Sequence, residues 1–200
     1  MISVQAISKS FGEITALDNI NLKVHEGEIF GLIGPDGAGK TTLIRILTTL
    51  LLPDNGSATV MGLDVVKKYR PLRRQFGYMP GRFSLYEDLT VEENLELFAS
   101  IFGTTIEENY HLIEDIYKQI EPFKTRRAGK LSGGMKQKLA LSCAMIHRPE
   151  VIFLDEPTTG VDPVSRQEFW QMLNKLKGHG ITIFVSVLCY FFSLPLDVGT

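Results

Sequence analysis

The 200-residue sequence predicts a single α/β domain with an antiparallel β subdomain at its N-terminus and a helical subdomain inserted at about residues 81–145. Three observations support this fold class. Short apolar strands alternate with turns at the start of the chain, and a strand, a glycine-rich loop and a helix follow one another over residues 28–47. The middle of the chain has helical apolar spacing, and strands return after residue 150.

The individual elements follow from apolar periodicity and from turn and cap signals. The predicted strands are residues 2–8, 20–24, 28–33, 58–61, 76–79, 151–154 and 181–186. The predicted helices are residues 39–50, 91–102, 106–123, 132–147 and 163–176. The run PDNGS at residues 53–57 indicates a turn. Thr90 and Glu93 have the spacing of a capping box, which predicts a helix that begins at residue 91.

Composition and charge narrow the class of protein. The formal charge of −2 gives no reason to expect a nucleic-acid partner, and no long basic run indicates a membrane-surface patch. Cys143 and Cys189 lie in apolar surroundings, so we expect buried free thiols. The N-terminus has no secretory signal, which favours a cytoplasmic location. The apolar segment 181–196 is shorter than the roughly 20 residues that a membrane-spanning helix needs.

The run GPDGAGKTT fits G-x-x-x-x-G-K-[ST] between a buried strand and a helix, which is the context that a phosphate-binding loop requires. Its members are Gly34, Pro35, Asp36, Gly37, Ala38, Gly39, Lys40, Thr41 and Thr42. The glycines let backbone N–H groups point at a phosphate, and the helix dipole favours the same anion. Lys40 can reach the outer phosphates and the Thr41 hydroxyl can hold Mg²⁺. A chance glycine-rich turn is the alternative, and the flanking strand and helix argue against it.

Two acidic residues follow the apolar strand 151–154. Asp155 stands at the carboxyl end of that strand, where ligands of parallel sheets bind, and is placed to hold Mg²⁺. Glu156 is the next residue and can orient or deprotonate an attacking water. Adjacent acids at a strand end are also common in solvated turns, but a phosphate-binding loop in the same chain makes that reading weaker.

A second helix N-terminus is marked by the run LSGGMKQK. Ser132 is a good N-cap, and Gly133 and Gly134 leave their amide groups open to approach after Leu131. Such a terminus can bind phosphate, although alone it would be an ordinary cap. Its place about 20 residues before the Asp155–Glu156 pair favours a functional role.

The order GPDGAGKTT, LSGGMKQKLAL and VIFLDEPTTGVDP resembles the ATPase subunits of ABC transporters, and above all the exporter type that pairs with ABC-2 membrane subunits, including multidrug efflux pumps. The resemblance covers residues 1–186. It implies a P-loop NTPase core that binds ATP and Mg²⁺, with Gly34–Thr42 as Walker A (Asp36 standing where Asn is commoner) and Asp155 and Glu156 as Walker B and catalytic carboxylate. It also implies a homodimer or pseudo-dimer, a permease partner and a peripheral location on the inner face of the membrane.

The resemblance assigns further residues one by one. Leu131 to Gly134 match the signature that contacts the ATP of the opposite subunit. Phe11 matches the aromatic residue that stacks on adenine, and the alternative is a phenylalanine of the core. Asp162 matches a loop that crosses the dimer interface, and the alternative is an N-cap ahead of Pro163, with both roles compatible.

A contact with the membrane subunit is implied for the apolar cluster after the strand 76–79. The cluster consists of Phe83, Leu85 and Tyr86, and packing in the core is an equal alternative.

The sequence departs from the family pattern at two places. Gly81 stands where the family has a glutamine, and Val187 and Leu188 stand where it has a Ser- or Thr-His pair. His179 precedes the strand and is expected in a surface turn. The tail 187–200 resembles nothing in the family, which suggests a C-terminally truncated chain.

Three functions remain open at this point. The first is an ATP-hydrolysing exporter subunit, and the second is a degenerate nucleotide-binding module with little or no ATPase activity. The third, a soluble ABC-type ATPase of translation or DNA repair, would require basic nucleic-acid surfaces that the composition does not indicate.

Overall fold

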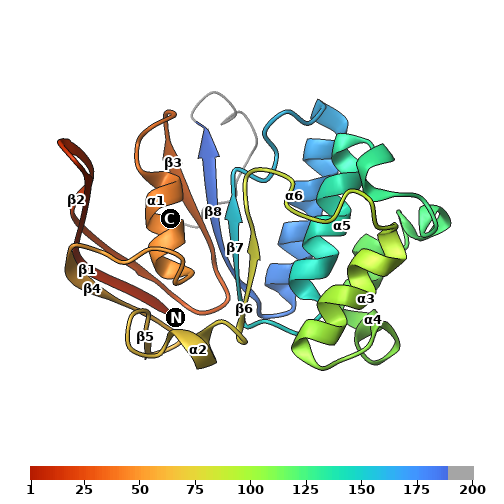
Figure 1. Ribbon diagram of the computed structural model, residues 1–200, viewed down its shortest axis with the longest axis horizontal. Coiled ribbons are helices and arrows are strands. Elements are labelled where there is room, and N and C mark those ends of the chain that lie inside the picture. The colour runs from red at the N-terminus through yellow and green to blue at the C-terminus, as the bar shows by residue number, and fades with distance from the viewer. Residues whose placement is uncertain (189–200) are drawn as a thin grey trace.

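The computed structural model describes residues 1–188, so the expectations for Cys189 and for the rest of the tail lie outside the described residues. Two four-stranded sheets organise the chain, an antiparallel one in the order β2-β1-β4-β5 and a parallel one in the order β3-β8-β7-β6. Figure 1 shows α1 between the two sheets, and α5 and α6 on the other side of the parallel sheet, with α3 and α4 outermost. The predicted α/β fold with an N-terminal antiparallel sheet and inserted helices is confirmed.

The antiparallel sheet is built from β1 (Ile2–Phe11), β2 (Ile14–Val24), β4 (Asn55–Val60) and β5 (Leu63–Asp64). In β1 the side chains of Ile2 and Val4 alternate inward, as a half-buried strand requires. The turn predicted up to residue 57 is shorter than expected, because β4 already begins to pair with β1 at Asn55.

The parallel sheet consists of β3 (Ile29–Gly34), β6 (Phe76–Met79), β7 (Val151–Asp155) and β8 (Thr182–Leu188). All residues of β7 are buried, as expected for a central parallel strand. Strand β8 extends two residues beyond the prediction, because Val187 and Leu188 continue the ladder with β3.

Five helices occupy the predicted regions, α3 with the predicted ends and the others with shifted ends, and α2 was not predicted. The helices are α1 (Lys40–Leu47), α2 (Tyr69–Leu72), α3 (Val91–Phe102), α4 (Ile106–Tyr117), α5 (Gly133–Met145) and α6 (Pro163–Gly178), with 3-10 turns at Glu121–Phe123 and Ala128–Lys130. The capping box predicted at Thr90 is present, and Thr105 forms a second one. Helix α4 ends before the predicted residue 123, where the chain changes to a 3-10 turn that contains Pro122. Within residues 1–188, no helix combines the length and apolar character needed to cross a bilayer.

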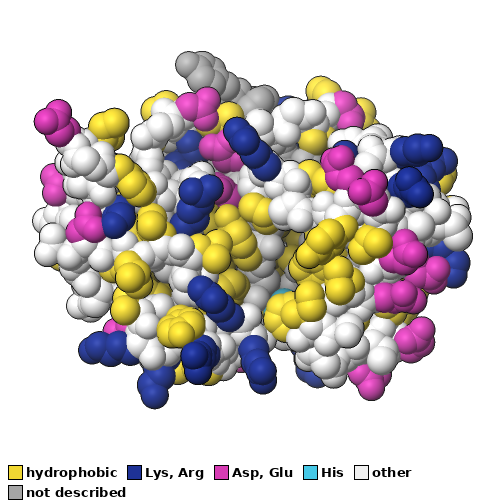
Figure 2. Space-filling model, in the orientation of Figure 1, with side chains coloured by type: hydrophobic (Ala, Val, Ile, Leu, Met, Phe, Trp, Pro, Cys, Tyr) yellow, Lys and Arg dark blue, Asp and Glu magenta, His cyan; other side chains and the backbone are white. Residues whose placement is uncertain are grey.

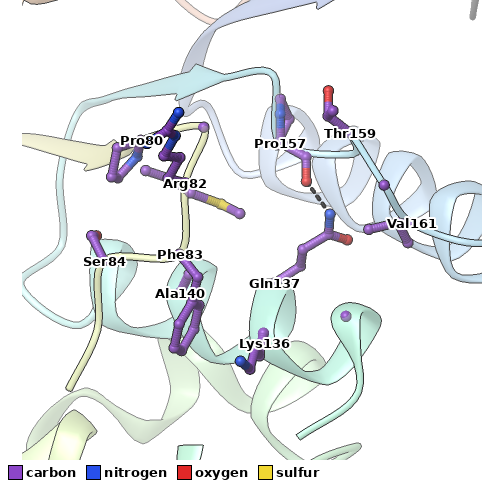
Figure 3. Close-up of a pocket in the computed structure, with 14 residues that line it drawn as sticks. Pro80, Arg82, Phe83, Ser84, Lys136, Gln137, Ala140, Pro157, Thr159 and Val161 are labelled. Atoms are coloured by element: carbon purple, nitrogen blue, oxygen red, sulfur yellow. Dashed lines mark hydrogen bonds between the residues drawn. The ribbon is translucent and has the colours of Figure 1, made fainter. Parts of the chain in front are cut away.

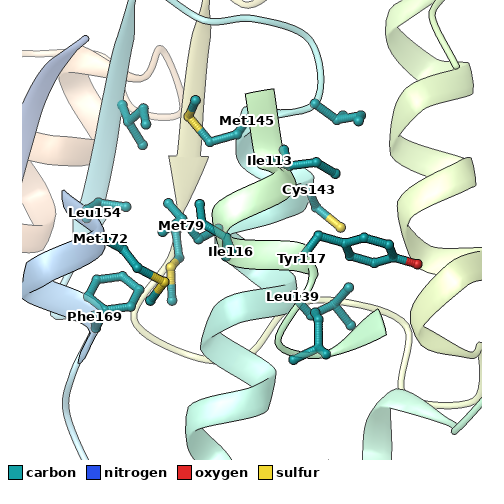
Figure 4. Packing of buried hydrophobic residues seen from close by; sticks show 14 of the residues in the cluster. Met79, Ile113, Ile116, Tyr117, Leu139, Cys143, Met145, Leu154, Phe169 and Met172 are labelled. Carbon is teal, nitrogen blue, oxygen red and sulfur yellow. The ribbon is translucent and has the colours of Figure 1, made fainter. Parts of the chain in front are cut away.

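Two apolar clusters hold the layers together. One lies between α1 and the two sheets and includes Phe153 and Phe184. The other joins the parallel sheet to α3–α6, and Figure 4 shows Leu154 of β7 facing Phe169 of α6 within it. Cys143 of α5 is buried in this second cluster as a free thiol, as predicted, and burial raises its pKa.

Candidate functional site

The glycine-rich loop links β3 to α1 at the carboxyl edge of the parallel sheet (Figure 1). Gly37 and Gly39 have φ of 76° and 82°, a region that favours glycine. A Cβ on Gly39 would lie 2.3 Å from the carbonyl oxygen of Ala16, so the backbone of β2 leaves no room for a side chain. Helix α1 begins at Lys40 with no side-chain cap, so its first N–H groups are open to an anion. Asp36 lies exposed on the loop.

Lys40 is buried, with 5% of its surface exposed. Its Nζ donates to the carbonyl oxygens of Gly34 (2.9 Å) and Pro35 (2.8 Å) and lies 3.2 Å from Oε1 of Glu156. These partners compensate the ammonium for the water that it loses. The loop cation and the carboxylate after β7, far apart in sequence, are therefore direct neighbours.

Thr41 and Asp155 form a second link between the loop and β7. The Thr41 hydroxyl donates to Oδ1 of Asp155 at 3.0 Å, and Asp155 is only 4% exposed. A hydroxyl and a carboxylate are hard oxygen donors of the kind that hold Mg²⁺ together with phosphate oxygens, so this pair fits the ion. Tyr78 is a neighbour of this pair. Burial is the largest cause that raises the pKa of its phenol, and the negative charge of Asp155 is the second, so the phenol stays neutral.

Ser186 is a site residue that sequence reasoning missed. It is fully buried in β8, and its hydroxyl donates to Oδ1 of Asp155 at 2.8 Å while accepting from the backbone N–H of Glu156 at 2.9 Å. The hydroxyl of Ser186 therefore links the carboxylate of Asp155 to the backbone of Glu156. A serine between the apolar residues Val185 and Val187 of a buried strand was the signal that could have revealed it, since buried hydroxyls need partners.

Glu156 begins the turn after β7 with φ of 47°, an uncommon conformation for a residue with a side chain. Its carboxylate reaches Lys40 through Oε1, and its Oε2 accepts from Thr159 at 3.4 Å. Backbone strain of this kind concentrates at functional sites. The turn places the carboxylate beside the phosphate-binding loop instead of in the core.

The run Leu131–Gly134 begins α5. The Ser132 hydroxyl caps the helix by accepting from the N–H of Met135 at 3.3 Å. A Cβ on Gly134 would lie 2.6 Å from Oγ of Ser165, so this glycine allows α5 to pack closely on the first turn of α6. Gly133 approaches the segment that follows Glu156, with Val161 as its neighbour.

Comparison with known proteins identifies this arrangement. Residues 17–159 match the family described as ABC transporter. The chain belongs to the ABC transporter family. It is an ATP-binding domain of that family, as the sequence motifs predicted.

Two curated relatives of the ABC domain are both named as ATP-binding proteins. It is 47% identical over 190 residues to "Probable multidrug ABC transporter ATP-binding protein YbhF" of Escherichia coli (strain K12), an alignment that covers 93% of this chain and 33% of the relative. It is 41% identical over 187 residues to "Daunorubicin resistance ATP-binding protein DrrA2" of Streptomyces coeruleorubidus, covering 92% of this chain and 58% of the relative. The chain therefore spans about a third to three fifths of the length of these relatives.

Solved ATP-binding cassettes share the fold. The dimeric cassette MJ0796 in a post-hydrolysis state with ADP and Pi has a TM-score of 0.82 at 29% identity, over 94% of this chain and 88% of that chain. An ATP-binding subunit of an ABC transporter has a TM-score of 0.83 at 30% identity, over 94% of this chain and 79% of that chain.

The ABC domain has a cavity of about 150 Å³ beside the segment that contains Gly81. Figure 3 shows the segment after β6 on one side of it, the segment after β7 on the other, and α5 below. Gln137 of α5 points into this space and donates to the carbonyl oxygen of Pro157. A Cβ on Gly81 would lie 2.9 Å from the carbonyl oxygen of Asp155, so the segment after β6 packs closely on the carboxyl end of β7 here.

Three further residues that the sequence analysis singled out lie outside the site around Lys40. Phe11 is 51% exposed at the end of β1, which excludes the core alternative and leaves adenine stacking as a prediction. Asp162 caps α6 by accepting from the N–H of Ser165 at 2.9 Å, and this bond is the largest cause that lowers the pKa of its carboxyl. The cap alternative is therefore confirmed, and the interface role stays a prediction. His179 is exposed after α6, as expected.

The three residues of the apolar cluster after β6 differ in their burial. Leu85 is buried in the core and Tyr86 is 58% exposed, while Phe83 is half-buried beneath the Lys136 ammonium, which lies 4.8 Å from its ring centre. The core alternative therefore holds for Leu85.

Proposed function

We propose that this ABC domain is the ATP-binding subunit of an exporter and couples ATP binding and hydrolysis to transport through a membrane permease. The observation that carries the proposal is the meeting of Lys40, Thr41, Asp155 and Glu156 at one edge of the parallel sheet, within 3.2 Å of one another in pairs. Four groups of these types match the parts that phosphoryl transfer to water requires.

In this proposal the triphosphate of ATP lies along Gly34–Thr42, against the open N–H groups of α1. Lys40 exchanges its bonds to the loop carbonyls and to Glu156 for bonds to the outer phosphates. That exchange frees the Glu156 carboxylate to orient the attacking water and accept its proton. Thr41 and Asp155 would hold Mg²⁺, which would supply charge neutralisation on the phosphates.

The partners follow from the family and from the relatives. Ser132, Gly133 and Gly134 lie at an open helix start beside the segment after Glu156, which supports contact with the ATP of a second ATP-binding domain. Asp162 would take part in the same interface. The names of the relatives, which refer to a multidrug transporter and to daunorubicin resistance, support efflux as the process and the inner membrane surface as the location.

A second candidate keeps nucleotide binding without turnover. It is favoured by two observations: Gly81 offers no side chain and leaves no room for one beside Asp155, and Val187 continues the ladder of β8 with a buried apolar side chain. Neither position can present the polar group that the family uses there.

Single-turnover hydrolysis of ATP with Mg²⁺ separates the two candidates. An exporter ATPase loses at least a hundredfold in rate when Glu156 is replaced by Gln, a loss within the range for a general base. The exposed Glu26→Gln variant is the matched control and should retain the rate. If Glu156→Gln hydrolyses ATP as fast as the wild type and the Glu26→Gln control, the proposal that this site hydrolyses ATP would be refuted. Binding of ATP that is lost in Lys40→Ala, without turnover in the wild type, would identify the degenerate module.

A further inference from the structure

A cationic and apolar surface surrounds the short helix α2, which lies beside β5 at the edge of the antiparallel sheet opposite β2 (Figure 1). Five of the eight residues 67–74 are Lys or Arg, and all five are exposed. We call this surface the α2 patch. Its cations are Lys67, Lys68, Arg70, Arg73 and Arg74. Its exposed apolar side chains are Leu50, Leu52, Val66 and Tyr69.

No cation of the α2 patch takes part in a salt bridge within the described part of the chain, where every ion pair involves lysines of other segments. The carboxylate nearest to this segment in the sequence is that of Asp64 at the end of β5, and its Oδ1 accepts from the backbone N–H groups of Val66 (2.9 Å) and Lys67 (2.8 Å). The bond from Lys67 is the largest cause that lowers the pKa of Asp64. The carboxylate is thus occupied by backbone, and the positive charge of the patch remains available.

The patch is held in shape by packing. Leu72 is completely buried and anchors α2. The ring of Tyr69 has the guanidinium carbons of Arg70 and Arg73 at 5.8 Å and 5.2 Å from its centre. Arg73 also donates to Oγ1 of Thr49 at 2.6 Å and to its carbonyl oxygen at 2.8 Å.

The bond from Arg73 to Thr49 places the loop after α1 beside α2. Leu50 and Leu52 in that loop are 56% and 63% exposed. The patch therefore combines long flexible cations with apolar and aromatic side chains on one surface. This combination is typical of protein surfaces that lie on a bilayer, where cations reach the headgroups and apolar groups enter the boundary below them.

Basic and acidic side chains gather at different parts of the molecular surface, and the α2 patch lies in the basic part. Figure 2 shows dark-blue Lys and Arg side chains around hydrophobic ones along the lower edge, over α2, and magenta acidic side chains gathered at the right, over α3 and α4. The separation persists although the net charge is only −2. A negative surface would orient the chain with the α2 patch toward it.

We propose that the α2 patch binds the surface of an anionic phospholipid bilayer directly. An acidic protein partner is less favoured, because exposed leucines and a tyrosine spread among the cations fit a headgroup boundary better than a purely ionic contact. The proposal does not depend on ATP hydrolysis or on a permease, so its test is made without either.

The test is flotation of the full chain, without nucleotide, on vesicles of phosphatidylcholine alone and of phosphatidylcholine mixed with phosphatidylglycerol. We expect binding only to the anionic vesicles, with release at high salt. The double variant Lys67→Gln/Lys68→Gln should bind about 25-fold more weakly, because each cation near an anionic surface contributes a factor of about five. The control Lys23→Gln/Lys177→Gln removes two exposed lysines elsewhere and should bind like the wild type.

Three outcomes would overturn the proposal. These are equal binding to neutral and anionic vesicles, equal losses in the two double variants, and no vesicle binding by a chain that binds soluble polyglutamate. The last would assign the patch to an acidic polypeptide instead. A failure of ATP hydrolysis would leave the vesicle result unchanged, so the two proposals are tested separately.

Discussion

Replacing Ser186 by alanine tests whether β8 holds the two acidic residues of the site in place. The Ser186 hydroxyl lies 2.8 Å from Oδ1 of Asp155 and 2.9 Å from the backbone nitrogen of Glu156. The variant removes a bond to a buried carboxylate and leaves a backbone N–H without its acceptor. Hydrogen bonds to charged groups contribute about 1.5–3 kcal/mol, and an unsatisfied buried donor costs about 1–3 kcal/mol.

The two contributions overlap, because the Thr41 hydroxyl still donates to the same carboxylate oxygen of Asp155. We therefore expect Ser186→Ala to lower the free energy of unfolding by about 2–4 kcal/mol. The matched control is Ser142→Ala in α5. Ser142 is equally buried, but its hydroxyl donates only to the carbonyl oxygen of Lys138 within the same helix. Its loss should cost about 0–1 kcal/mol, since alanine is the better helix former.

The measurement is a urea titration followed by the fluorescence of Trp170, the one tryptophan of the chain, which packs against the cluster around α6. Similar slopes for the wild type and both variants would show that the change in midpoint reports stability. A Ser186→Ala loss no larger than that of Ser142→Ala would refute the claim that this hydroxyl organises the site.

Three further predictions use the same assay. Gly39→Ala should cost about 2–4 kcal/mol, since its Cβ would meet a backbone carbonyl at 2.3 Å, whereas Gly37→Ala, with open space around it, should cost about 1–2 kcal/mol. Burial lowers the pKa of His147, although its bond to the carbonyl oxygen of Phe76 acts against this. The unfolded chain therefore binds a proton first, and stability should be constant above about pH 6.5 and fall below it, less so in His147→Gln. Thr105→Ala removes a capping box and should cost about 1 kcal/mol, with no loss counting against the cap.

Elements with strong local signals could be predicted from the sequence to the residue. Helix α3 (Val91–Phe102) has a capping box at one end and Gly103 in the left-handed conformation at the other, and its bounds match the prediction. Strand β2 was predicted at residues 20–24 but begins at Ile14, because its first half is largely exposed and interrupted by bulges. Strand β5 and helix α2 are too short to show a period, and the prediction missed both.

The site was only partly readable from the sequence. Motifs placed Lys40, Thr41 and Asp155 on the correct elements, and the structure brings their side chains together, while their roles remain predictions. Ser186 could not be assigned, since its partners depend on which strand neighbours β7 in the sheet. The α2 patch was missed for a similar reason. Tyr69, Pro71 and Leu72 interrupt the basic run in sequence, although all five cations are exposed on the folded chain.

The strand order β3-β8-β7-β6 has a consequence for biosynthesis. Strand β3 carries the glycine-rich loop and emerges early from the ribosome, but its only strand neighbour in the parallel sheet of residues 1–188 is β8, which comes more than a hundred residues later. Until then β3 has an unpaired edge, and the loop and the acidic turn after β7 have no strand between them to set their spacing. Such distant parallel pairing is slow to form. The nascent chain should therefore depend on protection by chaperones until β8 inserts, and ligand binding should begin only after that step.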